Sequence, residues 1–167
     1  QNPADRGVLP DSDDLEHNEP RTQALWGNLM GGGSGVEWYF GFAFPNMDIN
    51  CEDFRSRERM WIQTRHALEF FRTHLPFWEM EPDNSLVSGA PEGRVLARGD
   101  SLYAVQLPSG GNAALKLGSG AYSVRWYDPR SGGDLQKGSA DSITGPGVKA
   151  IGRPPSDSGR DWIVLVK

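Results

Sequence analysis

The stretch LMGGGSGVEWYFG, residues 29–41, places five glycines around a serine and then continues into valine, glutamate and aromatic residues. A phosphate-binding P-loop would need a lysine after the glycines and a helix after the loop. A dinucleotide-binding loop would need a strand before the glycines and a helix after them. Here no lysine is present, and the residues that follow favour a strand. The stretch therefore predicts the end of a helix followed by a strand over residues 36–40.

The predicted strand carries a carboxylate. Because side chains alternate along a strand, Glu37 and Tyr39 lie on one face, and Trp38 lies on the other with the apolar residues. A carboxylate in such a strand is costly to bury unless it is paired. Two interpretations stay open. Glu37 lies at the mouth of a barrel beside aromatic platforms for sugars, or it forms an ion pair with Arg55, Arg57 or Arg59.

A helix is expected on each side of this strand. Pro20 suits the first helical position, and apolar residues from Ala24 to Met30 recur at helical spacing until the glycines, which predicts a first helix. Asn50 is the expected N-cap of a second helix, which Pro76 ends. The residues of the second helix expected to face the core are Trp61, Thr64, Leu68, Phe71 and Leu75.

After about residue 82 the sequence changes to short alternating segments separated by turn clusters such as LPSGGN and DPRSGG. Such spacing is typical of an antiparallel β-sandwich. The expected strands cover residues 94–98, 102–107, 113–117, 122–127, 147–151 and 161–166. The predicted fold class is therefore α+β, with two helices and one strand in residues 1–80 and a sandwich in residues 81–167. The helices and the single strand cannot bury their apolar faces alone.

The composition excludes several classes of protein. The formal net charge of −5 argues against a nucleic-acid partner. No apolar run approaches the roughly 20 residues that a membrane span needs. The single cysteine, Cys51, excludes an internal disulfide and is expected to be a buried, inert thiol. Neither a metal nor a cofactor is predicted, because no metal-ligand spacing relates His17, His66 and His74. His66 is expected at the surface or in a groove.

Two features of the β-region have more than one interpretation. The sequence DPR at residues 128–130 predicts a turn in which Asp128 caps backbone amides and Arg130 pairs locally. Contact with a ligand is the alternative. Trp126 and Trp162 are expected to fill the sandwich core, because aromatic side chains dominate core burial. Alternatively, these two tryptophans and Tyr127 form a platform that binds sugar or protein.

Two blocks resemble known families. RTQALWGNLMGGGSGVEWYFG, residues 21–41, with the later CEDFRSRERMW and ALEFFRTHLPFWEM, resembles the closing segment of a bacterial glycoside-hydrolase-like (β/α)8 barrel family of largely unknown function. VRWYDPRSGG, residues 124–133, resembles the signature of the small β-domain that follows those barrels and carries the family label of a collagen-binding domain. Together the blocks cover most of residues 15–167.

The resemblance implies that residues 21–31 are the seventh barrel helix, residues 36–40 the eighth strand and residues 53–75 the eighth helix. Residues 1–80 would then be the incomplete C-terminal end of a barrel. The partner that covers the helices would be the missing N-terminal portion of the barrel or another chain.

The resemblance also implies a site. Active groups of such barrels lie at the C-terminal ends of the strands, so Glu37, Trp38 and Tyr39 are predicted to bind substrate. The principal carboxylates of similar glycosidases come from the fourth and seventh strands, which would precede Gln1. The catalytic residues are therefore unknown from this sequence, and the chain alone is not expected to be a competent glycosidase.

The leading hypothesis is the C-terminal segment of a secreted or periplasmic glycoside hydrolase, although no signal peptide opens this sequence. Its sandwich would brace the barrel and, as a second role, contact a poly- or oligosaccharide. The alternative is a stand-alone β-sandwich module that binds carbohydrate or protein. In a third reading, the chain is a subunit that another chain completes.

Overall fold

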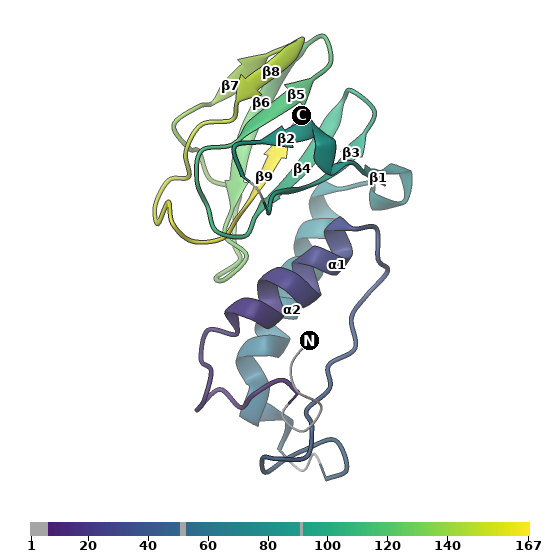
Figure 1. The fold of residues 1–167 in the computed structure, drawn as a ribbon, viewed down its shortest axis with the longest axis vertical. Coiled ribbons are helices and arrows are strands. Elements are labelled where there is room, and N and C mark those ends of the chain that lie inside the picture. Colours follow the sequence, from purple (N-terminus) through teal and green to yellow (C-terminus); the bar gives the residue numbers. More distant parts are fainter. Residues whose placement is uncertain (1–6, 51–52, 91) are drawn as a thin grey trace.

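The computed structural model describes residues 7–50, 53–90 and 92–167. Layered β-strands form one end of the molecule, and two helices lie against them and extend away from them (Figure 1). A long connection after the first helix runs along the helical part to the opposite end (Figure 1). Cys51, predicted to be a buried thiol, lies outside the described residues.

Both predicted helices form. The first consists of a π-helical segment, η1 (Pro20–Trp26), and one turn of α-helix, α1 (Gly27–Met30), and Pro20 takes the predicted first position. The second consists of a 3-10 turn, η2 (Phe54–Arg57), and α2 (Glu58–His74). The mixed α+β class is therefore confirmed.

The N-cap of the second helix differs from the prediction. The side chain of Asp53 accepts a hydrogen bond of 3.1 Å from the backbone N–H of Arg55. Asn50 precedes this residue by three positions, and its own N–H donates to the carbonyl of Met47. The prediction of Asn50 is wrong because the chain is still in a turn there.

The six strands predicted after residue 82 form within one residue at each end, and three further strands are present among the described residues. The three that were not predicted are two or three residues long, too short for alternation to be seen. The strands are β1 (Glu81–Pro82), β2 (Val87–Ser88), β3 (Arg94–Arg98), β4 (Leu102–Leu107), β5 (Ala114–Leu117), β6 (Ala121–Tyr127), β7 (Ser142–Thr144), β8 (Gly147–Ala150) and β9 (Trp162–Val166). The short 3-10 turns η3 (Phe77–Glu79) and η4 (Asn84–Leu86) precede β1 and β2.

The strands make two antiparallel sheets, ordered β1-β3-β4-β9-β6-β7 and β2-β5-β8. A hydrophobic core fills the space between the sheets. Trp126 and Trp162 lie in this core with their rings edge to face at 6.1 Å. Both side chains are buried, so the prediction that they belong to the core is confirmed.

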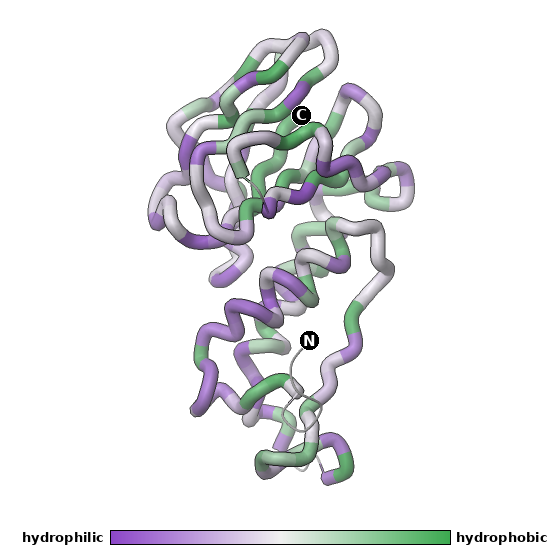
Figure 2. The backbone as a smooth tube through the Cα atoms, in the orientation of Figure 1, coloured by the Kyte–Doolittle hydropathy of each residue, from purple (hydrophilic) through white to green (hydrophobic). Residues whose placement is uncertain are grey.

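The larger sheet is buried on both faces. Along β9, Trp162, Val164 and Val166 belong to the core between the sheets. Ile163 and Leu165 belong to a second core, which the sheet shares with the helices. Hydrophobic residues accordingly concentrate in the sheet layers, and they appear again at the end of the molecule away from the sandwich (Figure 2).

The second core is built around aromatic rings. The ring of Trp26 lies 5.6 Å from that of Phe70 on α2 and 6.2 Å from that of Tyr127 on β6. The Tyr127 hydroxyl donates a 2.9 Å hydrogen bond to the backbone carbonyl of His66, and burial raises the pKa of Tyr127 to about 12. This core joins helices and sandwich into one packed unit.

The buried face of α2 differs from the prediction. Trp61 is 38% exposed and Leu68 is 39% exposed, although Phe71 and Leu75 are buried as expected. The helix carries two apolar stripes, and the residues that it buries are Met60, Gln63, His66, Ala67, Phe70 and Phe71. Helical periodicity alone could not choose between these stripes, because both recur every three or four residues.

The predicted strand over residues 36–40 is also corrected. The alternation is confirmed, since Val36 and Trp38 pack against the second core while Glu37 points to solvent. Within the described residues, however, no strand forms here, and the backbone of residues 36–38 makes no hydrogen bond. A strand needs a neighbouring strand to pair with. In the described ranges, residues 36–40 make one bond between backbone groups, in which the N–H of Val8 donates to the carbonyl of Tyr39 at 2.7 Å.

A buried ion pair holds the first helix to the sandwich. Arg21 Nε and Nη2 donate to the two carboxylate oxygens of Asp161, each at 2.9 Å, and both residues are buried. Arg21 also donates to the side chain of Asn18 and to the backbone carbonyl of Glu16. Nearby, Gln106 Nε2 donates to the carbonyl of Thr22 at 2.7 Å. These bonds satisfy the buried polar groups at the junction.

A second close contact joins α2 to the sandwich. The ring of His66 lies so near Gly132 that a Cβ there would approach His66 Cδ2 to 2.5 Å. Gly132 also has a φ of 68°, a conformation that favours glycine. Burial of His66, with Arg65 beside it, lowers the pKa of the imidazole, although Glu69 and Asp128 act in the opposite direction.

Breaking the buried ion pair is expected to destabilise the chain strongly. Replacement of Asp161 by Asn leaves the Arg21 charge buried without a carboxylate, which costs about 3–5 kcal/mol in the free energy of unfolding. Urea denaturation followed by tryptophan fluorescence measures this change. Glu16→Gln is the matched control, because its exposed pair with Arg160 contributes less than about 1 kcal/mol. Equal losses for the two variants would contradict the assignment of Arg21–Asp161 as the anchoring pair.

The stability is expected to fall in mild acid because of His66. Its pKa in the folded chain lies below the unfolded value of about 6.5, so the unfolded chain takes up more protons in this range. The contribution of neutral His66 is therefore complete above pH of about 6.5 and is lost as the pH falls through the folded pKa. Unfolding free energies measured from pH 8 to 5 should show a shallower slope for His66→Gln. An unchanged slope would rule out this role.

Candidate functional site

The three predicted site residues do not share one face. Trp38 packs towards α2, and its indole N–H donates a 3.0 Å hydrogen bond to Thr64 Oγ1. Glu37 and Tyr39 point to solvent, and Tyr39 is 49% exposed. In the described ranges, Glu37 forms no ion pair with Arg55, Arg57 or Arg59, the arginines of the alternative interpretation. Glu37 and Tyr39 therefore remain available to a ligand or a neighbouring segment.

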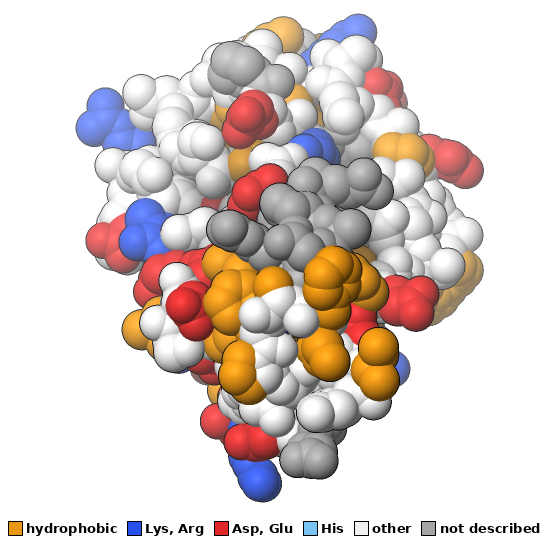
Figure 3. Space-filling view, turned by 60° about the horizontal axis from the view of Figure 1, so that its bottom comes forward, with side chains coloured by type: hydrophobic (Ala, Val, Ile, Leu, Met, Phe, Trp, Pro, Cys, Tyr) orange, Lys and Arg blue, Asp and Glu red, His pale blue; other side chains and the backbone are white. Residues whose placement is uncertain are grey.

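The connection that carries these residues continues into an apolar end of the molecule. Phe40 is buried, and its backbone N–H is capped by Asp48 Oδ1 at 2.8 Å. Phe42, Ile49 and Phe54 are exposed around it. Figure 3 shows hydrophobic side chains gathered on this end. Such a concentration of exposed apolar side chains marks an interaction surface.

The DPR turn performs the structural task predicted for it. Asp128 Oδ1 accepts hydrogen bonds from the backbone N–H of Arg130 at 2.9 Å and from its Nε at 2.7 Å. Burial opposes ionisation of Asp128, but the hydrogen bonds from Arg130 outweigh it and lower the pKa of the carboxyl. The guanidinium of Arg130 lies 5.4 Å from the ring centroid of Trp162. The turn thus lies between the sandwich, at Trp162, and α2, at His66.

The alternative binding platform of the sandwich is not formed. Trp126, Tyr127 and Trp162 are all buried, with exposures of 2% or less, so they cannot present a stacking surface. The prediction of a platform made of these residues is therefore wrong. The large aromatic residues that are exposed come instead from the first 80 residues of the chain, including Phe77 and Trp78.

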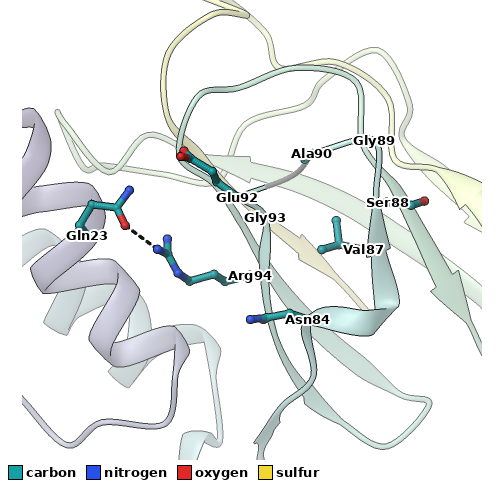
Figure 4. A pocket seen from close by; sticks show the side chains of 9 residues that line it. All are labelled: Gln23, Asn84, Val87, Ser88, Gly89, Ala90, Glu92, Gly93 and Arg94. Atoms are coloured by element: carbon teal, nitrogen blue, oxygen red, sulfur yellow. Dashed lines mark hydrogen bonds between the residues drawn. The ribbon is translucent and has the colours of Figure 1, made fainter.

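A polar pocket of about 530 Å³ lies between η1 and the start of the sandwich (Figure 4). Arg94 at its wall donates to Gln23 Oε1 at 2.5 Å and to Gln106 Oε1 at 3.2 Å. No carboxylate pairs with this guanidinium among the described residues. Glu92 and Asn84 complete the polar lining (Figure 4). Planar amide, guanidinium and carboxylate groups can bind hydroxyl groups as donors and acceptors.

Sequence reasoning missed this pocket because its parts are distant along the chain. Gln23 lies on the first helix, whereas Arg94 lies on β3, and the strand was predicted without any sign of that neighbour. No group of three or more His, Cys, Asp or Glu residues that could hold a metal occurs in the described part of the chain. In that same part, no helix is long and apolar enough to cross a membrane.

The fold is similar to two solved structures. One is a glycoside hydrolase family 5 protein from Bacteroides vulgatus ATCC 8482, with a TM-score of 0.67, 15% identity and coverage of 89% of this chain and 35% of the other. The second, described as a glycoside hydrolase, has a TM-score of 0.66, 15% identity and coverage of 89% and 36%. At this identity the likeness shows the fold alone. The chain spans about a third of the length of each protein.

The curated proteins provide no match to the chain. Residues 82–167, slightly more than half of the sequence, match the model of a family described as "Putative collagen-binding domain of a collagenase". The matched range begins at β1 and includes both sheets and the DPR turn. The chain therefore belongs to this collagen-binding domain family.

Proposed function

We propose that the chain is the C-terminal segment of a secreted glycoside hydrolase. In this proposal residues 1–80 form the last units of a (β/α)8 barrel, and residues 81–167 form a β-sandwich that braces the barrel. The likeness to glycoside hydrolase structures, of which the match covers 35% and 36%, supports this interpretation. The protein would be secreted or periplasmic, and its partner would be the N-terminal portion of the barrel.

The observation that carries the proposal is the unequal covering of the helical part. On one side, the buried pair of Arg21 and Asp161 and a shared aromatic core hold the helices to the sandwich. On the other side, apolar side chains such as Trp61 and Phe42 remain exposed. The unpaired backbone of residues 36–38 adds an open edge, which a neighbouring strand would satisfy. A brace that holds incomplete barrel units explains all three features.

We propose that this chain supplies only part of a hydrolytic site. Glycoside hydrolysis needs two carboxyl groups separated by about 5–5.5 Å or about 6.5–9.5 Å. Glu37 supplies one exposed carboxylate, whereas Asp48 is engaged in capping the backbone of Phe40. We propose that Glu37 and Tyr39 contact the substrate, while Trp38 between them fixes the connection to Thr64 of α2. The principal carboxylates would belong to preceding strands.

Catalysis is therefore expected only in a longer polypeptide. The encoding sequence upstream should contain strand–helix units, and the product of the longer sequence should hydrolyse a polysaccharide that the 167-residue chain leaves intact. In the longer product, Glu37→Gln should lower kcat/KM by roughly tenfold, because it removes a charged hydrogen-bond acceptor from the substrate. Glu58→Gln, an exposed change at the start of α2, is the control. Unchanged kinetics of Glu37→Gln would show that Glu37 does not contact the substrate. Turnover by the 167-residue chain would contradict the proposal that the principal carboxylates lie outside it.

A second function is favoured by the pocket of Figure 4. Its volume lies within the range of about 300–1,000 Å³ typical of ligand sites, and its wall presents Arg94, Asn84 and Glu92. Because these groups are polar and no aromatic ring lines the pocket, a hydroxyl-rich ligand such as a polysaccharide fits its chemistry. This function would belong to the sandwich as a binding module and would not require a complete barrel.

Affinity electrophoresis on plant and microbial polysaccharides tests the binding function. Glu92→Ala is expected to weaken binding about tenfold, because it removes a charged acceptor of hydrogen bonds. Glu81→Ala, at an exposed position of β1, makes the same change of charge outside the pocket. Immobilised collagen is the second ligand, because the family description names it. Binding of collagen alone, or equal behaviour of both variants, would contradict the carbohydrate function.

A further inference from the structure

A second polar pocket lies beside the pocket of Figure 4, where the start of the first helix meets the loops of the sandwich. It has a volume of about 400 Å³, which is within the range typical of ligand sites. Asn18, Glu19 and Thr22 form its helical wall, and Ser109 and Arg160 belong to its sandwich wall. We call it the Arg160 pocket, and we call the pocket of Figure 4 the Arg94 pocket.

The two pockets adjoin one another on both walls. On the helical side, Gln23 of η1 lines both pockets. On the sandwich side, the hydroxyl of Ser109 in the Arg160 pocket donates a 3.4 Å hydrogen bond to Glu92 Oε2 in the Arg94 pocket. The helix and the sandwich therefore enclose one elongated groove, which consists of the two pockets and which we call the junction groove.

Gln23 presents a hydrogen-bond donor at the point where the pockets adjoin. Arg94 Nη2 donates to Gln23 Oε1 at 2.5 Å, and the two side chains face each other across the Arg94 pocket (Figure 4). This bond fixes which end of the amide is the oxygen, so the Nε2 group points away from Arg94. Among the described residues, no acceptor is bonded to this Nε2 group. A ligand that extends from one pocket into the other can accept a hydrogen bond from it.

The length of the groove suits a chain more than a single small molecule. Its helical wall begins at Asn18, and Arg94 lies against the helix as far as Gly27, where a Cβ would approach Arg94 Cζ to 3.4 Å. Along a helix, the separation of these two positions corresponds to a length on the order of 10 Å. A chain of linked sugar units carries hydroxyl groups along its whole length, so it can bond to polar groups in both pockets.

Charges of both signs line each pocket. The Arg94 pocket contains Glu92 besides its guanidinium group, and the Arg160 pocket contains Glu19. Asp161 also lines the Arg160 pocket, where it keeps its ion pair with the first helix. These groups give the groove no excess of positive charge, so an anionic chain would meet a carboxylate near each guanidinium group. The lining therefore favours an uncharged ligand.

An extended peptide is a poorer occupant of the groove. Peptides that bind beside a sheet commonly add a strand to an open edge. Next to the Arg94 pocket, this edge of β3 is already bonded. The N–H of Val95 donates to Asn84 Oδ1 at 2.9 Å, and the carbonyl of Val95 accepts from the N–H of Asp83 at 2.9 Å. An added strand would find these groups occupied.

We propose that the junction groove binds one uncharged oligosaccharide chain, with one part of the chain in each pocket and Gln23 between the two parts. This inference rests on the binding function proposed for the pocket of Figure 4. It adds the second pocket and the length of the ligand. A chain bound in this way contacts both the first helix and the sandwich.

Isothermal titration calorimetry tests the proposal on the 167-residue chain. The probes are xylo-, manno- and cello-oligosaccharides of two, four and six units. In a series that binds, the hexasaccharide should bind at least about tenfold more tightly than the disaccharide, because it makes hydrogen bonds in both pockets. The stoichiometry should be one hexasaccharide per chain. Equal affinities for all three lengths would overturn the proposal.

Variants of the two pockets show whether one ligand occupies both. Glu19→Ala should weaken hexasaccharide binding at least about fivefold, because Glu19 lines the Arg160 pocket and not the Arg94 pocket. Gln23→Ala and Glu92→Ala should weaken it at least as much. Glu81→Ala, at an exposed position of β1, is the control and should bind as the parent does. Circular dichroism verifies that each variant is folded. A loss confined to Glu92→Ala would overturn the proposal.

The outcomes separate this inference from the binding function on which it rests. Disaccharide and hexasaccharide of equal affinity would contradict the second pocket and leave the function of the Arg94 pocket standing. Absence of binding by every oligosaccharide and polysaccharide would contradict both. Displacement of the hexasaccharide by tetragalacturonate or by a triple-helical collagen peptide at lower concentration would identify an anionic chain or a peptide as the occupant, and would overturn the proposal.

Discussion

The burial of one sheet on both faces is the constraint on which the rest of the structure depends. In β4 and β9 every residue is buried, and neighbouring residues serve different cores. Antiparallel sheets commonly leave one face to solvent, but this one cannot. Removing the helices would expose Ile163 and Leu165 and would leave the carboxylate of Asp161 without its arginine. The helical part and the sandwich therefore stabilise one another.

The continuous apolar sequence of β9 indicates that both faces of this strand are buried. Residues 162–166 read Trp-Ile-Val-Leu-Val, without the polar residues expected on a solvated face. The strand itself is predictable from the sequence, because glycine and proline clusters separate the segments of the β-region. What covers its second face is not, because periodicity describes a strand and says nothing of its neighbours.

Long-range pairs were beyond the reach of sequence reasoning for the same reason. Arg21 and Asp161 are separated by 140 positions, and neither belongs to a local motif. The DPR turn, in contrast, was predicted in detail because Asp128 and Arg130 are two residues apart and bond to each other. The parts of the candidate site divide in the same way. The outward direction of Glu37 followed from alternation, whereas the pocket at Arg94 needed the tertiary fold.

Two of the errors in the helical part have one physical origin. Residues 36–40 have the composition of a strand but form no ladder, and α2 carries apolar residues on more than one flank. In each case the residue pattern is suited to burial, but the pattern does not tell which neighbour covers which side chain.

Trp61 also contributes to the present structure, although it is partly exposed. Its ring lies 5.8 Å from that of the buried Phe40, and its indole N–H donates to the backbone carbonyl of Phe54 at 3.0 Å. The unpaired backbone of residues 36–38 lies along the same helix, at Trp38 and Thr64. Through Trp38 and through the contact of Phe40 with Trp61, the connection after α1 is thus held to α2 by side chains, without a β-ladder.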